Sequence, residues 1–158
     1  MPRTVLLVAA IGLLLPLTTA RSAPRCDPDG AGAADVRAVA EGIVAADNAR
    51  DIERVIGYYA PRATLMPLGE PPVTGHEAIR PRYEQLFRSF DPQIEARIDE
   101  VCVDGALAVV RGHNGGKLVP RGGGEPRTLD DVYLMVLERD DERRWHIRHL
   151  MWHPASRR

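Results

Sequence analysis

Residues 94–103 read Ile-Glu-Ala-Arg-Ile-Asp-Glu-Val-Cys-Val, and at this stretch the hydrophobic pattern of the chain changes its period. Apolar residues begin to alternate with charged ones, which indicates a β-strand with one buried face. Upstream, apolar residues recur at helical spacing, whereas downstream the strand pattern returns three times. This order predicts an α+β domain in which helices lie on one face of a sheet of successive antiparallel strands.

Three helices are expected before the change of period. Residues 35–48 carry apolar side chains at the spacing of one helical face. Asp51 can cap a second helix that ends at Pro61. A short strand over residues 63–66 follows, and a third helix begins near Gly75.

Three further strands are expected after it, over residues 107–113, 129–138 and 145–153. The glycine-rich residues 115–124 are interpreted as a long hairpin connection. They lack the lysine-hydroxyl pair and the following helix of a phosphate-binding loop. We therefore expect no nucleotide and no other cofactor.

The composition sets further limits on function. The 158 residues include 21 basic and 22 acidic ones, which give a formal net charge of −1. Proteins that bind nucleic acid normally carry a basic excess, and 5% aromatic residues leave few platforms for stacking bases. The chain is predicted to be a single domain that does not bind nucleic acid.

The N-terminus has the pattern of a secretory signal peptide. Residues 1–20 combine an arginine at position 3, a short apolar run and a small-residue end, and Pro16 interrupts the run. We expect cleavage after about this point, followed by a flexible leader over 21–34, the domain over 35–154 and a tail over 155–158. The expected location is secreted or periplasmic, without membrane contact after cleavage. The alternative is a membrane anchor formed by uncleaved residues 5–20.

Three short segments resemble a known superfamily. They are Asp51-Ile52-Glu53, then Tyr59-Ala60-Pro61-Arg62-Ala63-Thr64-Leu65, then Gly75-His76-Glu77-Ala78-Ile79-Arg80, and the closing Trp145-His146-Ile147-Arg148-His149 is similar too. Together they resemble the nuclear transport factor 2-like superfamily, and most of all its SnoaL-like and ketosteroid isomerase relatives. The resemblance implies a cystatin-like roll: a cone-shaped, curved antiparallel sheet wrapped round three N-terminal helices, with an apolar pocket inside. Members of this superfamily include isomerases, cyclases, dehydratases and proteins that only bind or dimerise.

The catalytic residues of the ketosteroid isomerases are mostly missing. The position of the family's base falls at Met66-Pro67, and its tyrosine on the first helix falls at Ile43. Only the family's protonated aspartate is matched, by Asp131. The resemblance therefore argues against that isomerisation mechanism.

Asp131, His113 and His149 are nevertheless the candidate catalytic residues. Period-2 spacing puts Asp131 on one strand face with Tyr133. His149 is expected to face the pocket with Trp145 and Met151, where it could act as acid or base. No spacing of histidines or cysteines favours a metal site, and none is expected.

Two functions remain open. The favoured one is an exported module whose apolar pocket holds a small hydrophobic ligand; the alternative is an acid–base enzyme on a hydrophobic carbonyl substrate, using Asp131 with His113 or His149. The expected pocket residues are Tyr59, Met66, Tyr83, Tyr133, Met135 and Met151. The opposite strand face, with Val132, Leu134 and Val136, is also apolar and is expected to form a homodimer.

The two cysteines, Cys26 and Cys102, permit one disulfide in an oxidising compartment. The other interpretation is a buried Cys102 with a mobile Cys26. If the bond forms, titration of the exported protein with a thiol reagent under denaturing conditions should find no free thiol. Two free thiols would contradict the disulfide.

Overall fold

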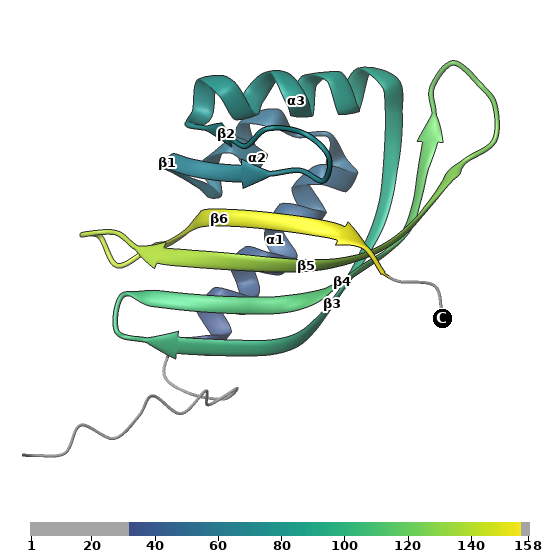
Figure 1. Cartoon of the computed structure of the whole chain (residues 1–158). Helices are drawn as coiled ribbons and strands as arrows, with labels where there is room; N and C mark the ends of the chain where they lie inside the picture. The colour runs from purple at the N-terminus through teal and green to yellow at the C-terminus, as the bar shows by residue number, and fades with distance from the viewer. Residues whose placement is uncertain (1–31, 156–158) are drawn as a thin grey trace, which may run out of the picture.

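The computed structural model describes residues 32–155, and it confirms the predicted α+β fold with a curved, unclosed sheet (Figure 1). The elements in chain order are α1 (Ala33–Ala49), α2 (Ile52–Gly57), β1 (Tyr59–Met66), β2 (Val73–Thr74), α3 (His76–Ser89), β3 (Phe90–Asp104), β4 (Leu107–Pro120), β5 (Arg127–Arg139) and β6 (Trp145–Pro154). The predicted signal peptide, nearly all of the leader and Cys26 lie outside the described residues. The Cys26–Cys102 disulfide therefore stays a prediction.

The six strands form one sheet in the order β2-β1-β6-β5-β4-β3. The successive strands β3, β4, β5 and β6 pair antiparallel, as expected, and the only parallel pair among the described strands is β1 with β6. Parallel neighbours need a long crossover connection, and β2, α3, β3, β4 and β5 all lie between β1 and β6 in the chain. Figure 1 shows α1 behind the four long strands and α3 beside β1 and β2.

The segments that carried the family resemblance hold the helices to the first strand. Asp51 caps α2 by accepting a hydrogen bond from the backbone N–H of Arg54 at 3.0 Å. Arg80 of α3 binds Glu53 of α2 through two hydrogen bonds of 2.6 and 2.9 Å. The ring of His76 contacts the backbone oxygen of Tyr59 at 2.9 Å. These motif residues thus have a structural part in joining α2, β1 and α3.

Two element boundaries differ from the expected ones. The second helix ends at Gly57 rather than Pro61, because Tyr59 already pairs with Ile147 in the sheet. β4 continues to Pro120 through the glycines that were expected to form a loop. Gly116 has φ 109° and passes so close to β3 that a Cβ there would lie 2.0 Å from the backbone oxygen of Gln93.

The core lies between α1 and the concave face of the sheet. Alternate residues of β5 point into it, and Tyr133, Met135 and Leu137 are all buried, as the period-2 pattern predicted. α1 contributes Val36, Ala40, Ile43 and Ala46, which are also buried (these residues recur at the spacing of one helical face). The core is therefore formed by the helical apolar face before residue 94 and the alternating apolar faces of the strands after it.

A bulge in β6 reverses the faces that were expected for the last strand. Val136 pairs with His149 and Leu137 pairs with Ile147, so Arg148 is an extra residue. One extra residue moves every later side chain to the opposite face. His149 and Met151 consequently lie on the outer face, and their expected inward orientation is wrong. Leu150 and Trp152 pack against the core in their stead.

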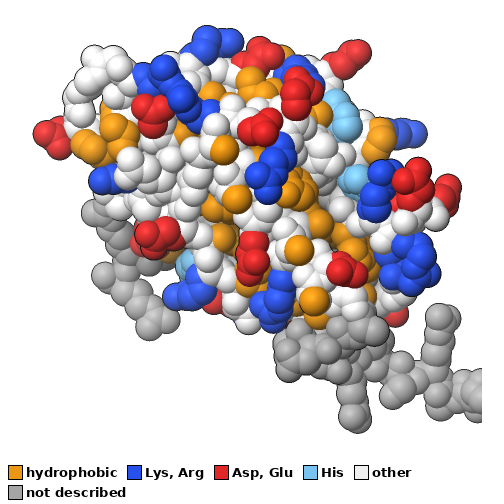
Figure 2. All heavy atoms as spheres, turned by 180° about the vertical axis from the view of Figure 1, so that it is seen from behind, with side chains coloured by type: hydrophobic (Ala, Val, Ile, Leu, Met, Phe, Trp, Pro, Cys, Tyr) orange, Lys and Arg blue, Asp and Glu red, His pale blue; other side chains and the backbone are white. Residues whose placement is uncertain are grey.

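The outer surface on the helical side of the molecule carries charges of both signs. Figure 2 shows this face, on which basic and acidic side chains are interspersed with small hydrophobic areas. Within residues 32–155, none of the helices has the length and hydrophobicity needed to cross a membrane.

Candidate functional site

A small cavity of about 40 Å³ lies inside the cone, between the helices and the central strands. α1 and α3 form one wall, and β4, β5 and β6 form the other. The lining consists of Ala40, Ile43, Val44, Asp47, Tyr83, Asn114, Tyr133, Met135 and Leu150. The cavity is therefore lined by polar as well as apolar side chains.

Three polar atoms of this lining are buried without a hydrogen-bond partner. They are Oδ1 of Asp47, Oδ1 of Asn114 and the hydroxyl of Tyr133. A buried polar atom without a partner costs on the order of 1–3 kcal/mol, and native structures contain few of them. In the described part of the chain, the remaining such atoms are Nε1 of Trp145 and Nδ1 of His146, neither of which lines the cavity.

Asp47 reaches the cavity from the last turns of α1. The next residue, Asn48, makes two hydrogen bonds of 2.8 Å to the backbone N–H and C=O of Ile94, which fix this end of the helix on β3. Asp47 is half-buried as a whole residue, but its Oδ1 is fully buried. Burial raises the pKa of Asp47 to about 8. The carboxyl is therefore mostly protonated and neutral at pH 7.

Two tyrosines lie together at the cavity, where Tyr83 belongs to the lining and Tyr59 lies behind it. The hydroxyls of Tyr59 and Tyr83 are 2.7 Å apart and share a hydrogen bond. Burial raises the pKa of both hydroxyls far above the ordinary value, and the nearby Asp47 adds to the effect. Burial also raises the pKa of Tyr133 to about 12. All three tyrosines are therefore neutral hydrogen-bonding groups at physiological pH.

The position of Tyr133 depends on a glycine in the neighbouring strand. Gly112 pairs with Tyr133, and a Cβ at Gly112 would lie 2.6 Å from the Tyr133 hydroxyl and 2.3 Å from the backbone oxygen of Arg97. Any side chain at position 112 would therefore push the tyrosine away from its observed place.

Asp131 lies on the inner face but outside the cavity lining. It pairs with Asn114 across β4 and β5 and is half-buried. Burial, and then the neighbouring Asp130, raise its pKa, while His153 acts against them. Its partner in the strand register, Asn114, is thus a residue of the cavity lining.

The two candidate histidines lie on the other side of the sheet. His113 pairs with Val132 and His149 pairs with Val136, both outer-face residues. His113 Nδ1 is 2.7 Å from Asp99, which also accepts a hydrogen bond from Arg97. The sheet therefore separates Asp131 from both histidines, and the expected acid–base pair is not assembled.

The expected pocket residues divide into three groups. Tyr83, Tyr133 and Met135 line the cavity, and Tyr59 stands behind it through its bond to Tyr83. Met66 and Met151 pair with one another across β1 and β6. Both belong to the outer face, because the bulge at Arg148 turns Met151 outward.

Asp47 and Asn114 were missed by the sequence analysis. A signal for Asp47 was available: Ala40, Ile43, Val44 and Asp47 stand at positions i, i+3, i+4 and i+7 of α1. A carboxylate on the apolar side of a helix is unusual and indicates burial. Asn114 likewise follows the inward-facing Val110 and Gly112 at a spacing of two.

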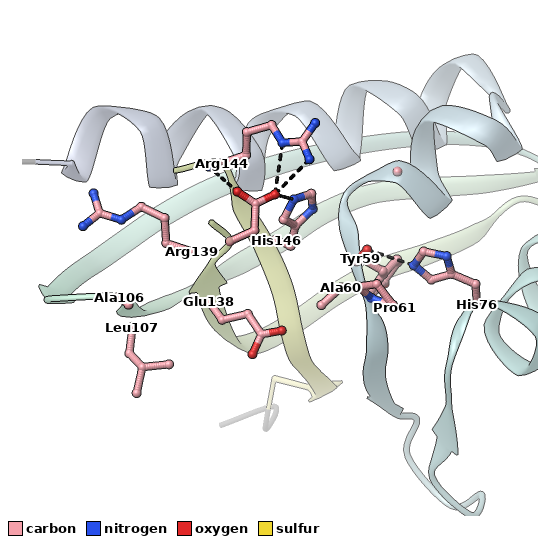
Figure 3. A pocket seen from close by; sticks show the side chains of 12 residues that line it. Tyr59, Ala60, Pro61, His76, Ala106, Leu107, Glu138, Arg139, Arg144 and His146 are labelled. Atoms are coloured by element: carbon pink, nitrogen blue, oxygen red, sulfur yellow. Dashed lines mark hydrogen bonds and ion pairs between the residues drawn. The ribbon is translucent and has the colours of Figure 1, made fainter. Parts of the chain in front are cut away.

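A larger hollow of about 500 Å³ lies where the β3–β4 and β5–β6 turns meet the start of β1 (Figure 3). Asp140 accepts hydrogen bonds there from the backbone and guanidinium of Arg144 and from Nε2 of His146. These bonds, that of the Arg144 backbone first, lower the pKa of Asp140 to about 2. Asp140, Arg144 and His146 are thus paired with one another, whereas Glu138 pairs with Arg148 outside the hollow and the Arg139 guanidinium lies over the ring of Trp145.

A metal site is not formed in the described structure. Over residues 32–155, no three His, Cys, Asp or Glu side chains come close enough together to hold a metal ion. The cone cavity does hold three buried groups, those of Asp47, Asn114 and Tyr133, that can donate or accept hydrogen bonds.

Comparisons with known proteins agree with the fold. The family model of the SnoaL-like domain matches residues 36–147. A ketosteroid isomerase-like protein from Erwinia carotovora atroseptica is similar in structure, with a TM-score of 0.74 and 23% identity over 80% of this chain and 98% of that one. A candidate dehydratase of the NTF2-like family from Streptomyces avermitilis has a TM-score of 0.67 and 17% identity, over 78% and 96% of the two chains. A search of curated proteins finds no match.

We expect Asp47 to make folding stability depend on pH. The unfolded chain loses this proton near the ordinary pKa of about 4, whereas the folded protein keeps it up to about pH 8. Between these values the folded state binds more protons, so stability falls as pH rises, by up to about 1.4 kcal/mol per pH unit. Asp47→Asn should remove this slope in urea unfolding measured across the same range. Asp35→Asn, the same change at an exposed position of α1, should leave the slope in place. Equal slopes for wild type and Asp47→Asn would contradict the burial of a neutral carboxyl.

Proposed function

Because the chain belongs to the SnoaL-like domain family, we propose that it binds a small, uncharged organic molecule in the cone cavity. The proposal is carried by the convergence of Asp47, Asn114 and Tyr133, whose buried polar atoms have no partner. Buried polar groups are normally paired with protein or water. A bound molecule with a polar end would supply the missing hydrogen bonds.

The rest of the lining favours an apolar body for this ligand. Ile43 and Val44 of α1 face Met135 and Leu150 of the sheet across the cavity. The cavity as observed, about 40 Å³, has room for about three water molecules or a ligand of similar size. A larger ligand requires the lining to move, and Met135 suits this because its side chain is unbranched and flexible.

Catalysis is the alternative function, as an acid–base enzyme on a hydrophobic carbonyl substrate. That enzyme would need Asp131 to act with His113 or His149. Asp131 belongs to the inner face of the sheet and both histidines belong to the outer face. Their separation favours binding over this form of catalysis.

Filling the cavity should abolish binding without unfolding the protein. Ala40 is buried and lines the cavity, so Ala40→Val adds two methyl groups at its wall. The protein purified from its own host should carry a ligand that native mass spectrometry detects, and Ala40→Val should lose it. Ala45→Val makes the same change on the exposed side of α1 and should keep the ligand. Equal ligand occupancy in the two variants, or no ligand in any preparation, would contradict the proposal.

We also propose that the outer sheet face joins two copies of the chain. Leu134 is 38% exposed and pairs with Met151, which is 40% exposed, and Val109 is exposed on the next strand. Large apolar side chains that adjoin on one face favour a protein contact. A two-fold dimer uses the same patch on both copies, so it needs no second complementary surface.

A charge at the centre of this patch should break the dimer. Leu134→Asp would leave one carboxylate from each copy in the contact, and light scattering at micromolar concentration should then report a monomer. Leu68→Asp puts the same charge on a leucine that is 63% exposed in the β1–β2 connection, and it should remain dimeric. A wild-type monomer, or dimers of both variants, would contradict this proposal.

Export is the third part of the proposed function. It is supported by the charged start, the short apolar run and the small-residue end of residues 1–20. Export would also supply the oxidising compartment in which Cys26 and Cys102 could pair. The mass of the exported protein identifies the cleavage point.

A further inference from the structure

We propose that Asp47 contacts the ligand directly and, in its protonated form, donates a hydrogen bond to a carbonyl oxygen of a neutral molecule. This inference rests on the proposed function, because it names the class of molecule that the cone cavity binds. It also identifies a ligand-contacting side chain on α1 that the sequence pattern did not lead us to expect.

The hydrogen-bonding capacity of the cavity matches a carbonyl oxygen. A protonated carboxyl and a phenol each offer one O–H donor, and a carbonyl oxygen has two lone pairs that can accept both. Asp47 supplies one donor from α1 and Tyr133 supplies the other from β5, and neither has a partner within the described protein. Asn114 adds an unpartnered acceptor from β4, which suits an adjacent hydroxyl of the same molecule.

The charge of the lining argues against an anionic ligand. Asp47 is the only charged residue type among the lining residues, which include no lysine, arginine or histidine. A carboxylate ligand would therefore be buried without a cation, at a large cost in desolvation. A cationic amine could pair only with the ionised form of Asp47, which burial disfavours.

Asp47 is the group of this cavity whose protonation changes near neutral pH, and ligand affinity should change with it. The titratable groups that face it are Tyr83 from α3, Tyr59 from β1 and Tyr133 from β5, and the pKa of each is raised, so they stay neutral. β4 and β6 present Asn114 and Leu150, which do not titrate. Asp131 lies on the same sheet face as Tyr133 but outside the lining.

The test compares three probes that share a five-membered carbon ring and differ in their polar group: cyclopentanone, cyclopentanecarboxylate and cyclopentylamine. Their binding to the full chain is measured by ligand-observed NMR titration between about pH 6 and about pH 9. Cyclopentanone should bind best, and its affinity should fall about tenfold per pH unit above the pKa of about 8. Asp47→Asn keeps an N–H donor but does not titrate, so the affinity of this variant for cyclopentanone should not change with pH. Asp35→Asn, the same change at an exposed position of α1, should keep the wild-type profile.

Three results would overturn the inference. The first is a ketone affinity that does not change with pH in the wild type, and the second is an Asp47→Asn profile that equals the wild-type one. The third is an amine affinity that exceeds the ketone affinity and rises with pH, because Asp47 would then act as an ionised acceptor. Absence of binding by all three probes would also overturn the inference, while the proposed function would stand. The proposed function fails separately, if Ala40→Val keeps the ligand of the host.

Discussion

The two hydrogen bonds between the side chain of Asn48 and the backbone of Ile94 connect the helical half of the chain to the sheet. They occur at the residue where the hydrophobic period changes, so the end of α1 is fixed on the beginning of β3. This anchoring holds α1 across the concave face, where it buries Val36, Ala40 and Ile43. It also directs Asp47, the residue before Asn48, toward the cavity that the helices and the sheet enclose.

Most of the fold could be predicted because element order depends on local hydrophobic period, which is visible in the sequence. The inward face of β5 followed from simple alternation. Simple alternation failed in β6, because the bulge at Arg148 shifts the register against β5, and its only sign in the sequence is the two consecutive polar residues between Ile147 and Leu150. The glycines at 115 and 116 were misassigned for a related reason: their contribution to the sheet is made by backbone groups alone.

The site was predicted less well than the fold. Three of its residues, Tyr83, Tyr133 and Met135, were expected from their apolar faces. Asp47 was missed because a carboxylate in a helix is usually assigned to solvent, and only its spacing from Ile43 could have corrected this. Ile43, which the resemblance places at the position of the ketosteroid isomerases' tyrosine, lies one helical turn before Asp47.

The parallel pairing of β1 with β6 has a consequence for the order of assembly. β6 lies between β1 and β5, and the bulged Arg148 donates a hydrogen bond to the backbone oxygen of Arg62, 86 residues earlier in the chain. Until β6 is available, β1 can pair only with the two-residue strand β2. Contacts between such distant residues form slowly, since a long loop must close before they can be made. This topology therefore makes the pairing of β1 with β6 a late step of folding.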